Sequence, residues 1–187
     1  MKQELLIGIT ESGVMHTDVD PPIPLETKFQ MVKESGVYDY FDKTPPLELE
    51  DDYRRCSEKY ELPILAGGWF YVLGRDEDLL MENLRLGARL GSLVHNTQIM
   101  MDHQDGSLVS DEQVVEIYLR AYETGEACGC RPTFEVHVNM WSEDFRRIEK
   151  VADLVEKQGI PFRMTLDHSH VIFKIDNPRE LEVFNIR

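Results

Sequence analysis

Short apolar runs alternate with amphipathic stretches along the chain. The apolar runs are bounded by turn residues and predict strands that begin near residues 5, 37, 63, 93, 132 and 162. In the clearest amphipathic stretch, Ile148, Val151, Ala152 and Val155 fall at i, i+3, i+4 and i+7, and Gly159 ends the pattern. Six repeats of strand and helix indicate a parallel sheet, because parallel neighbours need a crossover connection and a helix is the usual one.

The length of the repeat decides between the parallel architectures. The mean repeat is about 31 residues, and eight such units need about 250 residues, the typical length of a (β/α)₈ barrel. The chain has 187 residues. We therefore predict a single α/β domain over residues 1–187, a parallel barrel of the TIM type that is incomplete, with about six βα units, open sheet edges and a truncated C-terminus. A doubly wound sheet of six strands is the alternative, but no G-x-G-x-x-G turn follows the first strand.

Composition and charge narrow the classes of partner. Hydrophobic residues make up 42% of the chain, which is sufficient for a folded core. The formal charge of -15 repels phosphate backbones and anionic lipid headgroups, so we expect neither nucleic acid nor a membrane as a partner. The three cysteines form only a C-x-C pair, which fits neither a disulfide framework nor a structural zinc site. No apolar run is long enough to span a membrane, and we expect a cytoplasmic protein.

Two neighbouring predicted strands carry polar side chains on one face. Alternation places Glu135 and His137 on the same face of the fifth strand, and Arg163 and Asp167 on the matching face of the sixth. Glu135 and Asp167 lie near the C-terminal ends of these strands, where TIM barrels place their catalytic groups. Because burying such groups without compensation is costly, we expect partners or a metal ion between them.

Asp167 also begins a D-x-x-H pattern that ends at His170. Together with Glu135 and His168, this aspartate offers oxygen and nitrogen donors that suit a divalent cation such as Mn²⁺, Co²⁺ or Zn²⁺, and Mg²⁺ is also compatible. The spacing alone is common by chance, and the alternative is that Asp167 caps the following turn while His168 or His170 is a polar loop residue. Its position at a strand end, beside an inward glutamate, favours the metal site.

Other polar and aromatic groups fall at predicted strand ends. His95, Asn96 and Gln98 end the fourth strand, where barrels often place groups that contact the substrate, and a hydrated loop entry is the alternative. After the third strand, Trp69 and Phe70 follow two glycines and could form an aromatic wall for a sugar ring, although a buried aromatic plug is the commoner use.

The two carboxylate motifs and the strand order resemble the xylose isomerase-like barrels. This family includes sugar isomerases and epimerases, inosose dehydratases and the AP endonuclease 2 (endonuclease IV) type of DNA-repair enzyme. In it a Glu that ends the fifth strand and an Asp that ends the sixth bind a divalent metal, and a His three residues later lies near the substrate, so the resemblance points to Glu135, Asp167 and His170. The family completes its site with a His from the seventh strand and a Glu from the eighth, and no residue here can be assigned to either.

The resemblance implies a metal-dependent isomerase or epimerase of small sugars or polyols, or a lyase such as an inosose dehydratase. The predicted roles are as follows: catalytic residues Glu135, His137 and His170; metal ligands Glu135, Asp167 and His168; substrate contacts His170, His95, Trp69 and Arg163. The alternative is a catalytically silent barrel fragment that forms a homo-oligomer through its open sheet edges. An abasic-site endonuclease is disfavoured by the charge and by the shortage of histidines for a three-metal site.

Overall fold

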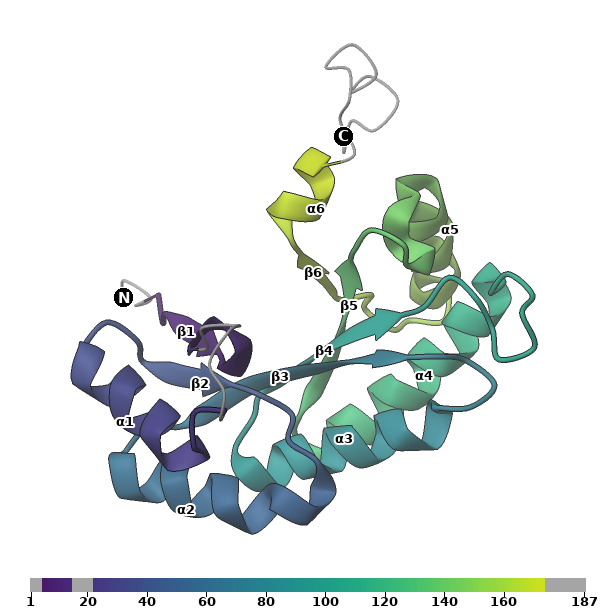
Figure 1. Ribbon diagram of the computed structural model, residues 1–187. Coiled ribbons are helices and arrows are strands. Elements are labelled where there is room, and N and C mark those ends of the chain that lie inside the picture. Colours follow the sequence, from purple (N-terminus) through teal and green to yellow (C-terminus); the bar gives the residue numbers. More distant parts are fainter. Residues whose placement is uncertain (1–4, 15–21, 174–187) are drawn as a thin grey trace.

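The computed structural model describes residues 5–14 and 22–173. Six strands lie side by side in the order in which they occur in the sequence, and each pair of neighbours is parallel. They curl through 199° into an open half-barrel (Figure 1). The strands are β1 (Gly8–Thr10), β2 (Tyr40–Asp42), β3 (Ile64–Tyr71), β4 (Val94–Ile99), β5 (Arg131–Val136) and β6 (Met164–Leu166). The predicted incomplete TIM-type barrel is therefore confirmed.

A helix follows each strand, and the helices α1 to α5 cover the convex face of the sheet, whereas α6 extends beyond the end of β6 (Figure 1). The α-helices are α1 (Leu25–Ser35), α2 (Glu50–Tyr60), α3 (Glu77–Leu90), α4 (Asp111–Cys128), α5 (Phe145–Glu156) and α6 (His168–Phe173), and three 3₁₀ turns are η1 (Glu11–Val14), η2 (Leu47–Leu49) and η3 (Trp141–Glu143). None of the helices in the described ranges combines the length and the apolar character needed to cross a bilayer.

The core lies between the convex face of the sheet and these helices. Phe41 of β2 is fully buried and stacks on Phe29 of α1, with ring centroids 4.4 Å apart. Phe134 of β5 is also fully buried and meets Tyr118 of α4 edge to face, at 5.0 Å. Because side chains alternate along a strand, the residues next to these aromatics point to the concave face, where polar groups gather.

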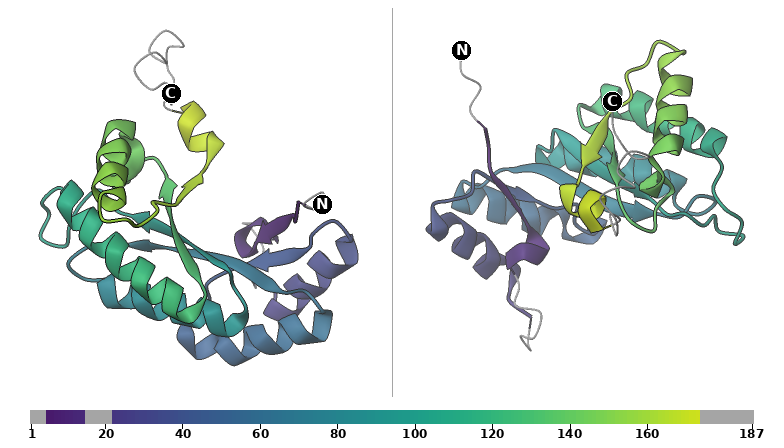
Figure 2. Two further views of the ribbon diagram at one scale, coloured as in Figure 1. Left: turned by 180° about the vertical axis from the view of Figure 1, so that it is seen from behind. Right: turned by 90° about the horizontal axis from the view of Figure 1, so that it is seen from above.

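The two outermost strands are shorter than their apolar patterns predict. The sixth strand was expected over 162–167, and β6 contains only Met164–Leu166; β1 is likewise three residues long. Each of them pairs with a single neighbour in the described sheet, and Figure 2 shows them at opposite ends of the arc. An edge strand gains hydrogen bonds on one side only, which shortens the segment that stays paired.

A charged cluster joins the C-terminal ends of β1 and β2 to the first two helices. The carboxylate of Glu11 lies 2.6 Å from Lys28 Nζ of α1 and 2.9 Å from Lys43 Nζ, and the hydroxyl of Tyr53 of α2 donates to it at 2.9 Å. Burial raises the pKa of Glu11, but the two ammonium groups and the Tyr53 hydroxyl outweigh it, so that this pKa lies below its ordinary value. The cluster thus fixes one end of the sheet against α1 and α2.

Candidate functional site

The concave faces of β5 and β6 meet as the alternation predicts. Glu135 of β5 pairs in register with Thr165 of β6, and the hydroxyls of Thr133 and Thr165 lie 2.7 Å apart across the two strands. Glu135 is only 6% exposed. Its carboxylate is therefore held inside the half-barrel, near the C-terminal end of its strand.

Two amides of β4 orient this carboxylate. The side-chain nitrogens of Asn96 and Gln98 both donate to Oε2 of Glu135, Asn96 at 2.7 Å. The other carboxylate oxygen, Oε1, accepts no hydrogen bond from residues 5–14 or 22–173. One oxygen is thus anchored, while the second remains available to a ligand.

The structure brings Glu135, Asp167 and His170 together. One donor atom from each residue lies within 4.8 Å of the other two. Two ligands of a tetrahedral Zn²⁺ at about 2.1 Å lie about 3.4 Å apart, so the three donors would have to approach one another by up to about 1.4 Å to share an ion. A set of two carboxylates and one imidazole has the chemistry that Mn²⁺, Co²⁺ and Zn²⁺ prefer.

Asp167 divides its two oxygens between a cap and the cluster. Oδ1 accepts from the backbone nitrogen and the hydroxyl of Ser169, at 2.8 and 2.6 Å, and these hydrogen bonds hold the pKa of Asp167 below its ordinary value. Oδ2 lies 3.5 Å from Nε2 of His170. The capping alternative and the cluster are therefore compatible, because they use different oxygens.

Two imidazoles contact each other, with their planes tilted by 41°. The rings of His137 and His170 have centroids 3.7 Å apart, and Phe70 of β3 meets His137 edge to face at 5.9 Å. Nδ1 of His137 lies 2.6 Å from the carbonyl oxygen of Val138 and must donate to it, so its Nε2 carries the lone pair. Nδ1 of His170 is buried and has no hydrogen-bond partner in the described part of the chain, which is an observation that a bound ligand would explain.

Four predicted site residues lie outside this cluster: His168, Arg163, Trp69 and His95. His168 is exposed at the start of α6. Arg163 was expected to face inward, but its guanidinium lies 3.2 Å from Glu126 of α4 and 5.2 Å from the ring centroid of Tyr122, on the helical side. Arg163 precedes β6, so the alternation of the strand does not fix its direction.

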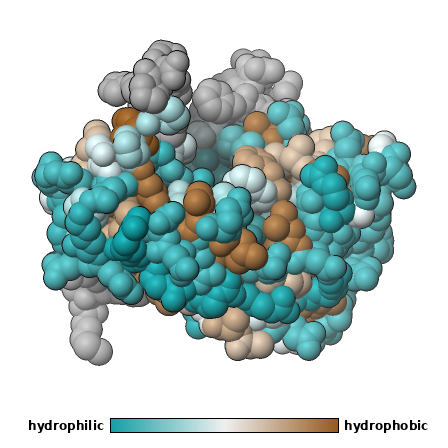
Figure 3. Space-filling view, turned by 60° about the horizontal axis from the view of Figure 1, so that its bottom comes forward, coloured by the Kyte–Doolittle hydropathy of each residue, from teal (hydrophilic) through white to brown (hydrophobic). Residues whose placement is uncertain are grey.

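Trp69 is the third of these residues and faces the helices. It pairs in register with Thr97, which is fully buried on the convex face, whereas its neighbour Phe70 pairs with Gln98 on the concave face. Trp69 is 44% exposed and lines a mostly apolar groove of about 280 Å³ with Pro46 of the β2–α2 connection and with residues of α3. Apolar side chains also show between hydrophilic ones on the helical face in Figure 3. Of the two aromatic residues, only Phe70 lies on the concave face.

His95 lies on the opposite face of β4 from Asn96 and is 1% exposed. Its Nε2 lies 2.7 Å from the hydroxyl of Tyr71, and its Nδ1 lies 3.3 Å from that of Thr44. Asn83 donates to the Tyr71 oxygen at 2.8 Å, so Tyr71 donates to Nε2 and the proton of His95 resides on Nδ1. Desolvation lowers the pKa of His95 to about 3.

We expect this buried imidazole to make folding sensitive to acid. The unfolded chain takes up a proton below about pH 6.5 and the folded chain does not, so stability present above that pH falls by about 1.4 kcal/mol per pH unit as the pH decreases toward 3. Urea unfolding at pH 7.5 and 5.5 measures the effect. The His95→Gln variant should lose about 1.4 kcal/mol less than the wild type over this interval, and an equal loss in both would contradict the assignment.

Asp42, at the C-terminal end of β2, also contributes to the electrostatics of the concave face. Burial and the charge of Glu135 raise the pKa of this carboxyl group, and Lys43 opposes them. Asp42 is not among the predicted site residues, because the pattern that begins near residue 37 does not show where the second strand ends. The strand-end rule that selected Glu135 would have found it with the correct boundary.

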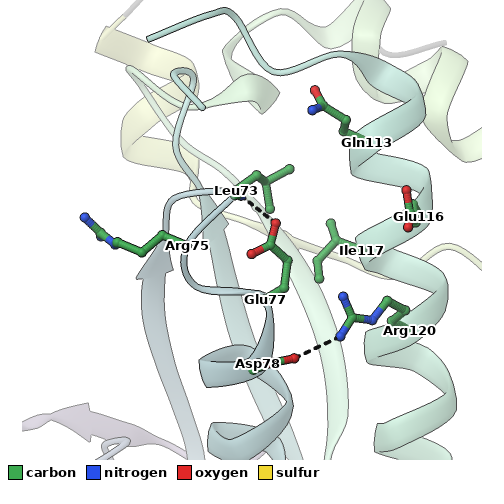
Figure 4. A pocket seen from close by; sticks show the side chains of 9 residues that line it. Leu73, Arg75, Glu77, Asp78, Gln113, Glu116, Ile117 and Arg120 are labelled. Carbon is green, nitrogen blue, oxygen red and sulfur yellow. Dashed lines mark hydrogen bonds and ion pairs between the residues drawn. The ribbon is translucent and has the colours of Figure 1, made fainter. Parts of the chain in front are cut away.

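A further hollow on the helical side, of about 380 Å³, lies between the start of α3 and α4 (Figure 4). Three of its charged side chains are engaged: Arg120 lies 3.1 Å from Asp78, and Glu77 accepts from the backbone nitrogen of Gly74 at 2.5 Å. It lies on the helical side of the sheet, opposite the concave face that carries Glu135, and forms no part of the cluster.

Comparisons with known proteins find likeness at the level of structure. No protein-family model matches the chain, and no curated protein sequence matches it. Among solved structures, 3-keto-D-glucoside 4-epimerase (YcjR) from E. coli superposes with a TM-score of 0.67 at 12% identity, over 97% of this chain and 75% of the epimerase.

Two further structures show the same relation. An AP endonuclease of family 2 from Brucella melitensis has a TM-score of 0.65 at 14% identity, over 97% of this chain and 76% of its own. A xylose isomerase domain protein from Planctomyces limnophilus has a TM-score of 0.63 at 9% identity, over 92% of this chain and 66% of its own. At such identities the likeness establishes the fold. The chain therefore has the fold of the xylose isomerase-like TIM barrels, and its described residues supply six of the eight strands of such a barrel.

Proposed function

We propose that the chain is a metal-dependent isomerase or epimerase of small sugars or polyols. The observation that carries the proposal is the cluster of Glu135, Asp167 and His170 at the C-terminal ends of β5 and β6. Active sites of TIM barrels lie at this end of the strands. An epimerase acting on a 3-keto-glucoside and a xylose isomerase domain protein are among the solved structures with this fold, which supports the same class of chemistry here.

Glu135, Asp167 and His170 would hold a divalent cation. Oε1 of Glu135 and Oδ2 of Asp167 are the carboxylate oxygens that are not committed to amide or capping hydrogen bonds. When bound, Mn²⁺, Co²⁺ or Zn²⁺ polarises a substrate carbonyl and the neighbouring hydroxyl, which acidifies the C–H bond between them. Mg²⁺ fits less well because it prefers oxygen ligands alone.

The remaining groups would bind the substrate and move its protons. His137 presents Nε2 as an acceptor, because its Nδ1 proton is engaged by the carbonyl of Val138. It can therefore take a proton from a substrate hydroxyl or from an acidified carbon. Phe70 stands beside it and presents an apolar ring to one side of the site.

Substitution of Asp167 by Asn tests the metal site. We expect the variant to bind Mn²⁺ about tenfold or more weakly than the wild type, because it loses an anionic ligand but keeps a hydrogen-bonding cap. Metal content after dialysis and titration calorimetry measure the change. An unchanged metal affinity would exclude Asp167 as a ligand.

Asp105 offers a matched control for this experiment. Its Oδ1 accepts from the backbone nitrogen and the hydroxyl of Ser107, at 2.9 and 2.6 Å, as Asp167 does from Ser169. It lies in an exposed loop and outside the cluster. Asp105→Asn should therefore leave Mn²⁺ binding unchanged, and an equal loss in both variants would indicate an effect of capping alone.

A second candidate is a catalytically silent half-barrel that forms a homo-oligomer through its edges. Within the described sheet, β1 and β6 each have one unpaired side, and Leu5, Leu6 and Ile7 next to β1 are exposed. Open parallel edges readily accept another strand. Sedimentation at several concentrations separates the candidates: an oligomer without bound Mn²⁺ supports the second, and a monomer that binds Mn²⁺ contradicts it.

A DNA-repair role is not favoured despite the likeness to an AP endonuclease. The net charge of -15 opposes contact with a phosphate backbone. Tight retention on DNA at low salt would be needed to support it.

A further inference from the structure

Asn96 buries a hydrogen-bond acceptor that no described residue satisfies. Its Nδ2 donates to Oε2 of Glu135 at 2.7 Å. A carboxylate only accepts hydrogen bonds, so the side-chain nitrogen of Asn96 must be the atom that faces Glu135. This contact therefore fixes which way the amide group is oriented. The oxygen Oδ1 is consequently held in one position, buried, and without a partner in the described ranges. Buried amide oxygens rarely lack a hydrogen bond, because burial removes their hydrogen bonds to water and nothing replaces them.

The neighbouring strands cannot supply the missing donor. At the level of Asn96, β3 presents Gly68 and β5 presents Thr133. Gly68 has no side chain, and the hydroxyl of Thr133 is engaged with Thr165 at 2.7 Å and with the carbonyl of His95 at 3.4 Å. The donor must therefore come from outside the strands that flank Asn96.

Gly68 lies in close contact with Asn96 of the neighbouring strand. A Cβ built on Gly68 would lie 3.0 Å from Cβ of Asn96 and 2.8 Å from its carbonyl oxygen. Any larger residue would force the two strands apart. Gly68 therefore brings β3 close to Asn96 without adding a side-chain donor for Oδ1.

We infer that Oδ1 of Asn96 accepts a hydrogen bond from a hydroxyl group of the substrate. This inference rests on the proposed function and names one of its recognition groups. Because the same amide is anchored on Glu135, the bound hydroxyl would lie next to the carboxylate of the cluster. A site with a fixed acceptor favours ligands that carry a hydroxyl there over deoxy or methyl-ether analogues, which would leave the oxygen unpaired.

Gln98 provides the matched control. It donates to the same oxygen of Glu135, from the same strand and the same face. Its own side-chain oxygen is not among the buried, unpaired atoms of the described chain. Asn96→Leu and Gln98→Met therefore each remove one amide donor from Glu135, but only Asn96→Leu also removes the buried acceptor.

Calorimetric titration with xylitol, ribitol, sorbitol and myo-inositol tests the inference, both without metal and with saturating Mn²⁺. We expect the wild type to bind at least one of these polyols, Asn96→Leu to bind it about tenfold or more weakly, and Gln98→Met to bind it less than about threefold more weakly. The two variants should change Mn²⁺ affinity to a similar extent, since each removes one donor from the same carboxylate.

Two results would overturn the role of Asn96. Equal weakening in both variants would mean that it acts only by orienting Glu135. A wild type that binds none of the polyols would mean that water alone satisfies Oδ1. The proposed function fails separately, through the loss of Mn²⁺ binding by the wild type or the absence of any effect of Asp167→Asn; polyol binding measured without metal still decides the role of Asn96 in that case.

Discussion

Replacement of Glu11 by Gln should destabilise the fold by about 3 kcal/mol, because removing one partner of a buried ion pair leaves uncompensated charge. The side chain of Lys28 is 8% exposed and that of Lys43 is 27% exposed, and both pair with this carboxylate. Urea unfolding near neutral pH measures the loss. A change below about 1 kcal/mol would mean that the cluster behaves as a surface ion pair.

A second carboxylate serves as the control for Glu11. Glu26 is also contacted by a lysine, Lys59, and a tyrosine, Tyr60, but on the exposed surface. Glu26→Gln should therefore change stability much less. The double variant Glu11→Met with Lys28→Met should recover part of the loss, because apolar residues can replace a buried pair.

Acid should reduce the contribution of Glu11. Its folded-state pKa lies below the ordinary value of 4.5, so the stabilisation is present above about pH 4.5 and is lost as the pH falls through the lower folded-state pKa. The difference in stability between the wild type and Glu11→Gln should accordingly narrow in that range.

Truncation of Phe134 to Ala should cost about 3–5 kcal/mol, the largest effect that we expect for a single apolar substitution. The ring is fully buried and contacts Tyr118, Phe162 and Trp141, with centroid distances of 5.0, 6.3 and 6.4 Å. Its removal leaves a cavity between β5 and the helices that these aromatic rings cannot close. Chemical denaturation measures the loss.

Phe70 is the control for Phe134. It is a strand phenylalanine as well, but it is 47% exposed on the concave face, and Phe70→Ala should cost less than about 1 kcal/mol. If Phe134→Ala does not fold, Phe134→Leu gives a smaller measurable loss of about 1–2 kcal/mol. Similar losses for Phe70→Ala and Phe134→Leu would contradict the assignment of the core.

The periodicity of the sequence predicts the architecture and the contents of the concave face near β5. Alternation along residues 133–137 suffices to place Glu135 and His137, and the D-x-x-H pattern places Asp167 and His170 beside them. These features depend on local geometry and on strand order, which repeat length and helix signals reveal.

The features of the site that the sequence does not predict depend on the register between neighbouring strands and on where each strand begins and ends. His95 and Asn96 are adjacent, and only the position of the paired segment decides which of them faces Glu135. Arg163 lies just before β6, where the alternation of the strand no longer applies. The convergence of two β4 amides on one oxygen of Glu135 likewise requires the lateral alignment of two strands.

The position of β6 at the edge of the described sheet would couple the binding of an ion at the proposed site to the folding of this edge. Two of the three donor residues belong to the segment that follows this three-residue strand, whereas Glu135 belongs to β5, which is paired on both sides. An ion bound between these residues would hold β6 and α6 against β5. By thermodynamic linkage, removal of the ion by a chelator would then destabilise β6 and α6. Residues 164–170 would accordingly be cleaved by a protease more readily without the ion than with it.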